Sequence, residues 1–117
     1  SINIVDESML KKADYVGSVS GSKVDKSEVF EYHIGEAGAP IIDNAPVVME
    51  CKVEDNYETE TFDNFIMSIS NTYVQEENLD EKGKIDYTKF SPVLFEFPKY
   101  TYLRTGDTIG NCLRLDK

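Results

Sequence analysis

One stretch of small and polar residues has the composition of an anion-binding loop. Residues 18–23 read Ser-Val-Ser-Gly-Ser-Lys, and the backbone N–H groups of such a loop, with a lysine nearby, can cradle a phosphate. The stretch is not a P-loop, because the Gly-Lys-Ser/Thr ending is absent and because it follows a predicted helix instead of preceding one. An ordinary surface loop is the alternative interpretation.

A pair of tyrosines near the C-terminal end is the second candidate for ligand contact. Tyr100 and Tyr102 alternate just before Gly106, and the faces of such rings can stack on a flat ligand. Alternating aromatic residues also pack within strands, so both readings stay open at this point.

Metal chemistry is not predicted. The chain has one histidine, His33, and two distant cysteines, Cys51 and Cys112, which do not give the spacing of a zinc site. The acidic pairs at 76–77 and 80–81 lack the alternation and the glycine of a calcium loop. We expect these acids to lie in solvated loops.

No catalytic residue emerges from the residue types either. No Gly-x-Ser-x-Gly is present, and His33 lies between apolar neighbours, which is more typical of a packed or surface histidine than of a base. Two cysteines so far apart are expected to be buried free thiols in a reducing compartment, which places the protein in the cytoplasm.

Composition and charge exclude several partners. The 117 residues suit one domain, 1–117, and 40% of them are hydrophobic. The net charge is −10, and the first 60 residues hold 13 acids and 5 bases. Nucleic acid and anionic membranes need a basic face, so neither is an expected partner. No apolar run approaches the roughly 18 residues of a membrane span, and no signal peptide opens the chain.

Periodicity then indicates the elements that must position these side chains. A helix is predicted over 7–15, with Asp6 as its N-cap and Gly17 as its C-cap, and a second short helical piece after Asp25. Alternation predicts strands over 1–5, 47–53, 65–74, 93–97 and 100–103. In the strand over 47–53, Glu50 falls on the polar face. The pattern favours a mostly β fold with short helices and antiparallel pairing.

Four blocks of this sequence resemble flavin reductase-like proteins of the flavoredoxin type. Residues 13–26 are similar to the family pattern A-x-x-x-G-x-x-S-G-x-x-x-D-K, and residues 39–52 resemble its Ala-Pro strand that ends in Glu-Cys-Lys. Residues 79–90 are similar to D-x-x-G-K-x-D-x-x-K, and residues 102–110 to the closing Y-x-x-x-G-x-x-x-G. The blocks follow the family's order across nearly the whole chain.

The resemblance implies an FMN-binding split β-barrel that is antiparallel and usually homodimeric. Family members pass electrons between NAD(P)H, or an electron-transfer protein, and flavin. The match covers the C-terminal part of the family domain only, so the chain is expected to be N-terminally truncated relative to the family, a partial barrel completed by dimerisation.

Four residues carry over from the family pattern as cofactor-binding candidates. Ser20, Gly21 and Lys26 match the S-G-x-x-x-D-K block, in which Lys26 would neutralise the phosphate, and Tyr102 matches the closing tyrosine and would line the flavin. The family's histidine before its F-I-G-E run is Phe62 here. This departure supports an alternative, in which the chain is a flavin-free member acting as a structural or interaction module.

Overall fold

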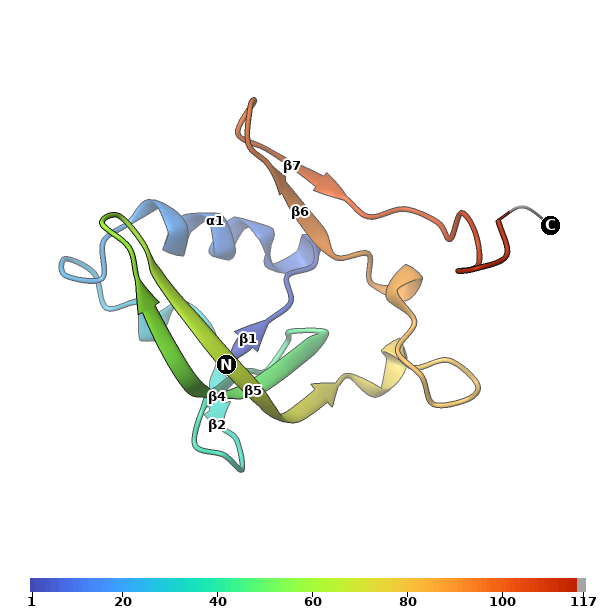
Figure 1. The fold of residues 1–117 in the computed structure, drawn as a ribbon, viewed down its shortest axis with the longest axis horizontal. Coiled ribbons are helices and arrows are strands. Elements are labelled where there is room, and N and C mark those ends of the chain that lie inside the picture. Colours follow the sequence, from blue (N-terminus) through green and yellow to red (C-terminus); the bar gives the residue numbers. More distant parts are fainter. Residues whose placement is uncertain (116–117) are drawn as a thin grey trace.

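The computed structural model describes residues 1–115 and shows a mostly β chain with one short α-helix (Figure 1). The strands are β1 (Ile2–Asn3), β2 (Tyr32–Ile34), β3 (Pro40–Ile42), β4 (Val47–Glu58), β5 (Asp63–Val74), β6 (Val93–Glu96) and β7 (Thr101–Arg104). The helix is α1 (Leu10–Ser18), and single 3-10 turns form η1 (Glu7–Met9), η2 (Lys26–Glu28), η3 (Glu76–Asn78) and η4 (Tyr87–Lys89). Every strand pair is antiparallel, as predicted.

Helix α1 confirms the helix predicted over 7–15, with a later end. It begins through the turn η1 and continues to Ser18, so Gly17 lies inside the helix and the expectation that it caps the C-terminus is wrong. Two side chains bind carbonyls of the last turn: Ser18 Oγ donates to Tyr15 O, and Lys26 Nζ donates to Val16 O. These bonds satisfy carbonyl groups that a helix end leaves without partners, and they replace a glycine cap.

The long hairpin β4–β5 is the largest element. Both predicted strands are present, but the expected polar connection after residue 54 is mostly strand, and the turn occupies only 59–62. Two β-bulges interrupt the pairing. Ser70 of β5 and Glu54 of β4 each have no direct partner, because the register moves between Glu50 and Cys51 and again between Val53 and Asp55. The second shift reverses the first.

A second hairpin, β2–β3, was not predicted. Its strands pair Tyr32 with Ile42, His33 with Ile41 and Ile34 with Pro40, and the turn between them spans 35–39. Because side chains alternate along a strand, Ile41 packs into the core while Tyr32 and Ile34 remain exposed on the other face.

The hairpin β6–β7 follows the predictions. The expected strands over 93–97 and 100–103 are present within one residue or two. Arg104 of β7 donates from Nε to Glu7 Oε2 at 2.9 Å and also pairs through Nη2, which fastens the hairpin to η1.

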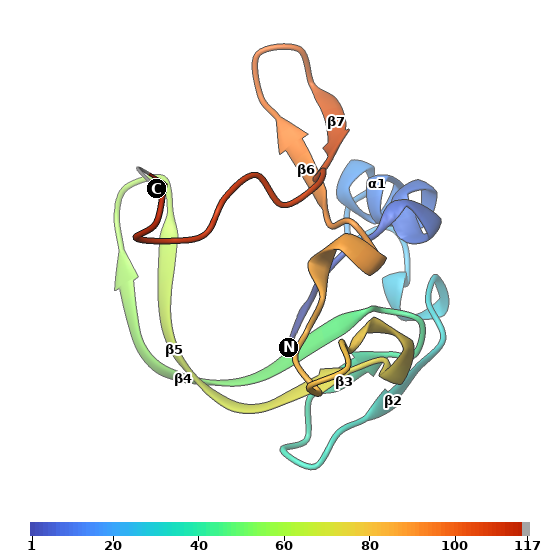
Figure 2. The same ribbon diagram turned by 90° about the vertical axis from the view of Figure 1, so that its right-hand side faces the viewer.

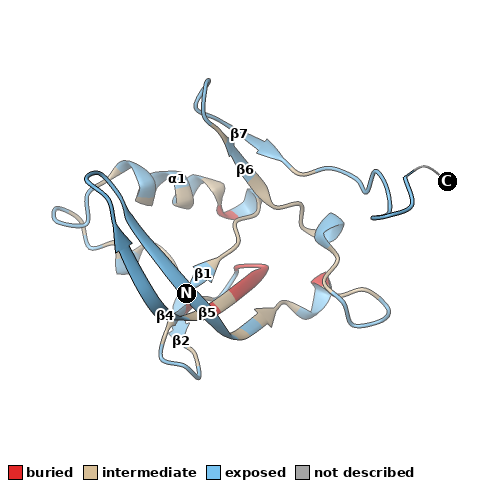
Figure 3. Ribbon diagram, in the orientation of Figure 1, coloured by how far each residue is buried: buried red, intermediate tan, exposed pale blue. Residues whose placement is uncertain are grey.

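The core is small. It consists of Met9, Ile41, Ala45 and Val48, with Val5, Phe30, Ile42 and Tyr73 packed against it. Figure 3 shows that burial concentrates at the start of β4 and that both projecting hairpins are exposed. The expectation that both cysteines are buried is wrong, because Cys51 is half-buried and Cys112 is exposed.

The shape is open. Figures 1 and 2 show β4–β5 and β6–β7 projecting in different directions from the body, and over residues 1–115 the strands close no barrel. The radius of gyration is 16.6 Å, whereas a compact domain of this length has about 13 Å. Within the same residues no helix is long and apolar enough to cross a membrane.

Candidate functional site

The loop after α1 holds three of the four predicted site residues. Asp25 accepts the backbone N–H of Ser27 at 3.0 Å and its hydroxyl at 2.6 Å, so it caps η2 as expected. These bonds, the one from the Ser27 side chain first, lower the pKa of Asp25, which stays charged. The cap fixes the backbone from which the next residue, Lys26, projects.

Lys26 lies between the loop and the helix. Its Nζ donates to Val16 O at 2.7 Å and is half-buried. A β-carbon on Gly21 would lie 4.0 Å from Lys26 Cε, which places this glycine against the lysine stem. An ammonium group has three donors, so one bond to a carbonyl leaves two for an anion.

Ser20 organises the loop from inside. Its hydroxyl lies 2.8 Å from Ser22 Oγ, and its carbonyl accepts the backbone N–H groups of Lys23 and Val24 at 3.0 Å. The structure therefore brings Ser20, Gly21 and Lys26 into one loop, as the sequence predicts.

A cleft with an apolar wall opens beside Lys26. Its volume is about 440 Å³, within the range of small-molecule sites. It is lined by Asn3, Lys26, Ser27, Phe30, Tyr32, Ile34, Pro40 and Ile42. The cleft thus combines one cation with aromatic and aliphatic side chains, the chemistry that suits a planar ring carrying a negative group.

Phe30, Tyr32 and Ile34 are cleft residues that the sequence reasoning missed. They follow one another at every second position, directly after the loop that holds Lys26. That alternation is the available signal, although the sequence analysis predicts only a short helical piece after Asp25 and no strand here.

Tyr102 lies on the other side of α1. Its hydroxyl donates to Asp14 Oδ1 at 2.6 Å, and this bond raises the pKa of Tyr102. It lines a separate cleft of about 280 Å³ with Phe95, Tyr100 and the end of α1. The Lys26 cleft does not contain Tyr102, and this second cleft does not contain Lys26, although both residues contact the same helix.

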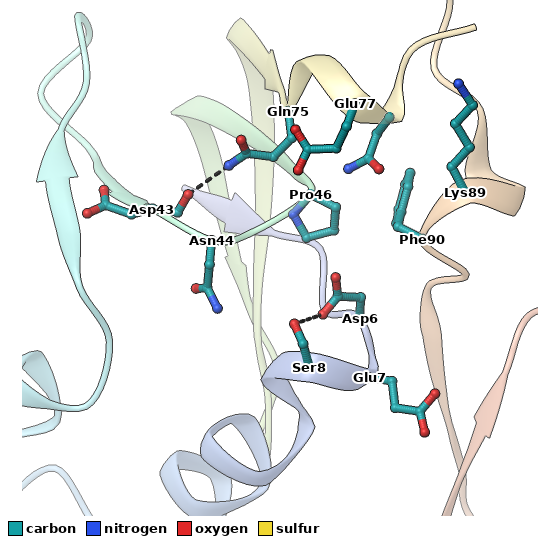
Figure 4. Close-up of a pocket in the computed structure, with 11 residues that line it drawn as sticks. Asp6, Glu7, Ser8, Asp43, Asn44, Pro46, Gln75, Glu77, Lys89 and Phe90 are labelled. Atoms are coloured by element: carbon teal, nitrogen blue, oxygen red, sulfur yellow. Dashed lines mark hydrogen bonds between the residues drawn. The ribbon is translucent and has the colours of Figure 1, made fainter.

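A third cleft, of about 590 Å³, has the wrong charge for a phosphate. Figure 4 shows Asp6, Glu7, Asp43 and Glu77 around it, with Lys89 at one edge. The Lys89 ammonium donates to Leu79 O at 2.7 Å. Four carboxylates against one lysine would repel a dianion, so this cleft is not the candidate site. Within residues 1–115 no three His, Cys, Asp or Glu side chains gather as a metal site.

Phe62 occupies the tip of the hairpin β4–β5. It is 70% exposed, and its backbone N–H and carbonyl bond to Thr59 across the turn. The residue that stands in place of the family's histidine is therefore on a projecting turn, outside the residues that line the Lys26 cleft.

Comparisons with known proteins fit this geometry. The flavin reductase like domain model matches residues 1–104. Flavoredoxin from Methanosarcina acetivorans shares 39% identity with a TM-score of 0.91, over 98% of this chain and 62% of that chain. Flavoredoxin of Desulfovibrio vulgaris (Miyazaki F) shares 28% identity with a TM-score of 0.88, over 99% of this chain and 63% of that one.

A more distant neighbour shows the fold alone. The FMN-binding protein from Thermus thermophilus is 24% identical, with a TM-score of 0.77, over 93% of this chain and 60% of that chain. None of the curated proteins matches. The chain spans less than two thirds of the length of the flavoredoxins that it matches. Because the domain model covers most of its residues and its fold agrees with that of flavoredoxins, the chain belongs to the flavin reductase-like family.

Proposed function

We propose that this chain binds FMN and passes electrons between NAD(P)H, or a redox partner protein, and the flavin. The observation that supports it most is the cleft beside Lys26, in which one cation meets a wall containing Phe30 and Tyr32. Membership of the flavin reductase-like family and the likeness to flavoredoxins support a flavin-binding redox role. FMN, when bound, supplies the electron-accepting ring.

The proposal gives a binding role to six residues of the chain. Lys26, with the backbone of Ser20 and Gly21, holds the phosphate, because these groups lie in one loop. Phe30 and Tyr32 cover one face of the ring and exclude water from it. Tyr102 is a further proposed flavin contact, since it meets the same end of α1 from the opposite side.

An FMN titration of the purified chain tests the proposal. Binding should shift the visible flavin absorbance and quench its fluorescence, and NADH added without oxygen should bleach the bound flavin. Lys26→Gln should weaken FMN binding about tenfold, the effect of losing one charge-assisted hydrogen bond. Lys23→Gln is the matched control, because Lys23 lies in the same loop but does not line the cleft.

The outcomes separate binding from reduction. Equal affinities for the two variants would remove Lys26 from the site, and no binding by the wild type would remove the flavin proposal. Tight binding without bleaching would exclude NADH as the donor and leave NADPH or a redox partner protein.

The second candidate function is a flavin-free interaction module. The observation in its favour is the exposed apolar surface of β4–β5 between residues 53 and 69, called the arm here. Its exposed apolar residues are Val53, Tyr57, Phe62, Phe65, Ile66, Met67 and Ile69. Monomeric proteins seldom leave such a patch uncovered. A colourless protein that forms a stable dimer would favour this function.

Both functions include a homodimer, in which the arm is covered by a second copy. The open sheets support it, because an isolated two-stranded hairpin is marginally stable in water. Light scattering after size exclusion tests it, and a monomer at all concentrations would exclude it. Cytoplasmic location is part of the proposal as well, and the two free cysteines are its support.

A further inference from the structure

A buried carboxylate holds the turn of the β2–β3 hairpin. Glu50 of β4 is 0% exposed. Its Oε2 accepts the backbone N–H groups of Ala37 at 3.1 Å and Ala39 at 3.2 Å, while Oε1 accepts Tyr73 Oη at 2.6 Å and Asn71 Nδ2 at 3.2 Å. The carboxylate therefore joins the turn at 35–39 to both long strands.

The contact is also steric. A β-carbon on Gly35 would lie 2.6 Å from the Glu50 carboxylate, so the turn approaches the acid as closely as a residue without a side chain allows. The position of the turn is therefore fixed by close packing at Gly35 as well as by the hydrogen bonds to Glu50.

The hairpin that Glu50 holds forms the wall of the Lys26 cleft. Tyr32, Ile34, Pro40 and Ile42 all line that cleft, and they belong to the two cross-strand pairs of β2–β3 that flank the His33–Ile41 pair. The opposite face of the hairpin places Ile41 in the core. Movement of the turn would therefore move the apolar wall relative to Lys26.

Hydrogen bonds, rather than a cation, stabilise the charge of Glu50. Within residues 1–115 Glu7 pairs with Arg104 and His33 Nδ1 lies 2.7 Å from Asp43 Oδ1, and neither contact involves Glu50. The titratable groups facing the site are Tyr73 from β5 and Glu36 from the turn, whose backbone N–H donates to Tyr73 Oη at 3.3 Å. The Tyr73 bond is the main cause that lowers the pKa of Glu50, and burial opposes it.

Resting on the proposed function, we infer that Glu50 is a positioning residue of the flavin cleft, whose carboxylate holds the β2–β3 wall in place and releases it on protonation. Four donors point at this carboxylate. A proton on Oε2 occupies a lone pair that the amides of the turn use. A proton on Oε1 displaces the Tyr73 or Asn71 donor that anchors the carboxylate to β5, so in either case the turn is held less firmly. The cleft then loses its fixed wall at acidic pH.

The first experiment needs no flavin. Hydrogen exchange of the Ala37 and Ala39 amides is measured in the wild type, in Glu50→Gln, and in Glu36→Gln as the matched control on the same turn. The protection factor, which is the exchange rate of an unfolded chain at the same pH divided by the measured rate, should fall at least about tenfold in Glu50→Gln at neutral pH and should not change in Glu36→Gln. In the wild type it should fall at pH values below the lowered pKa of Glu50, which lies under 4.5. Unchanged exchange in Glu50→Gln would overturn the inference.

The second experiment measures the affinity for riboflavin, which lacks the titrating phosphate. The wild type should bind equally from pH 8 to about 5, and more weakly only below the lowered pKa of Glu50, which lies under its ordinary value of 4.5. Glu50→Gln should bind about tenfold more weakly at neutral pH, without that acidic loss. Tyr73→Phe, which keeps the carboxylate, should lie between the two, and His33→Gln controls for the histidine on the same hairpin.

The two experiments test the inference and the proposed function separately. Faster exchange with unchanged riboflavin affinity would overturn the positioning role, because the turn would then move without affecting the site. If the wild type bound no flavin, the proposed function would fail, while the exchange result would still decide whether Glu50 holds the hairpin.

Discussion

Two glycines differ sharply in what a methyl group would meet. At Gly35 a β-carbon would lie 2.6 Å from the Glu50 carboxylate, whereas at Gly17 in α1 no atom lies within 4 Å. Gly35→Ala should therefore destabilise the fold by about 1–3 kcal/mol, the range for overpacking. Gly17→Ala should stabilise it by about 0.5–1 kcal/mol, because alanine favours a helix. Urea unfolding of both variants checks the opposite signs, and a stable Gly35→Ala would show that the turn can retreat.

At the same scale, some site residues were readable from the sequence and others were not. Ser20, Gly21 and Lys26 are near neighbours in one motif, and the structure places them in one loop, while their role in cofactor binding stays a prediction. Glu50 was expected on a polar face because Glu50 and Lys52 alternate with the apolar residues Met49 and Cys51 along the strand. Its donors come from a turn at 37–39 and from β5, and periodicity within one strand contains no information about either.

Elements were predicted best where the pattern was long. Strands 47–53 and 65–74 alternate over several residues and are present, as is the helix that begins at Glu7. The hairpin β2–β3 was missed because each strand has three residues and one begins with Pro40. Such strands exist through tertiary contacts, chiefly Ile41 in the core and Glu50 at the turn, and not through local propensity.

The arm should carry the self-association of the chain. Phe65→Gln with Ile69→Gln replaces two exposed apolar residues of β5 and should convert a dimer to a monomer, because polar side chains lose the gain from covering that face. Sedimentation velocity measures the change. Asn56→Gln, an exposed polar position on the same arm, is the control, and a dimer that survived the double substitution would place the interface elsewhere.

For the molecule as a whole, the free energy of unfolding should be constant around neutral pH and should fall at acidic and at alkaline pH. The pKa of Glu50 lies below its ordinary value of 4.5, mainly through Tyr73, and those of Asp25 and Asp86 lie below 3.8, mainly through the hydroxyls of Ser27 and Thr88. The unfolded chain therefore binds more protons below about pH 4.5, and the free energy of unfolding falls there.

At alkaline pH two tyrosines decide the stability. Their pKa values are raised, not lowered, and this also makes the free energy of unfolding fall. Glu50 and Asp14 raise the pKa of Tyr73 and Tyr102 above 10.0, so the unfolded chain loses these protons first and stability falls above about pH 10. Guanidinium unfolding from pH 3 to 11 measures the profile. Tyr73→Phe should flatten both flanks, and an unchanged profile would exclude the Glu50–Tyr73 pair as its source.

The open shape follows from the small core. Within residues 1–115 the buried apolar residues are Met9, Ile41, Ala45, Pro46, Val47 and Val48, and the radius of gyration of 16.6 Å exceeds that of a compact domain. If a second copy supplies the missing cover, the melting temperature should rise with protein concentration. Added salt should strengthen this association, since it screens the repulsion between chains of charge −10.

The two bulges of β4–β5 compensate each other. Between Cys51 and Val53 the strands pair one residue out of step, and beyond Glu54 the original register returns. Deleting Ser70 or Glu54 alone should therefore remove an unpaired residue and leave every cross-strand pair, and the face on which each side chain lies, unchanged. Deleting the paired residue Lys52 should be more destabilising than either deletion, and urea unfolding of the three variants measures the difference. Each of the two strands thus carries one spare residue, so the hairpin has two positions at which its length can change without turning a side chain to the other face.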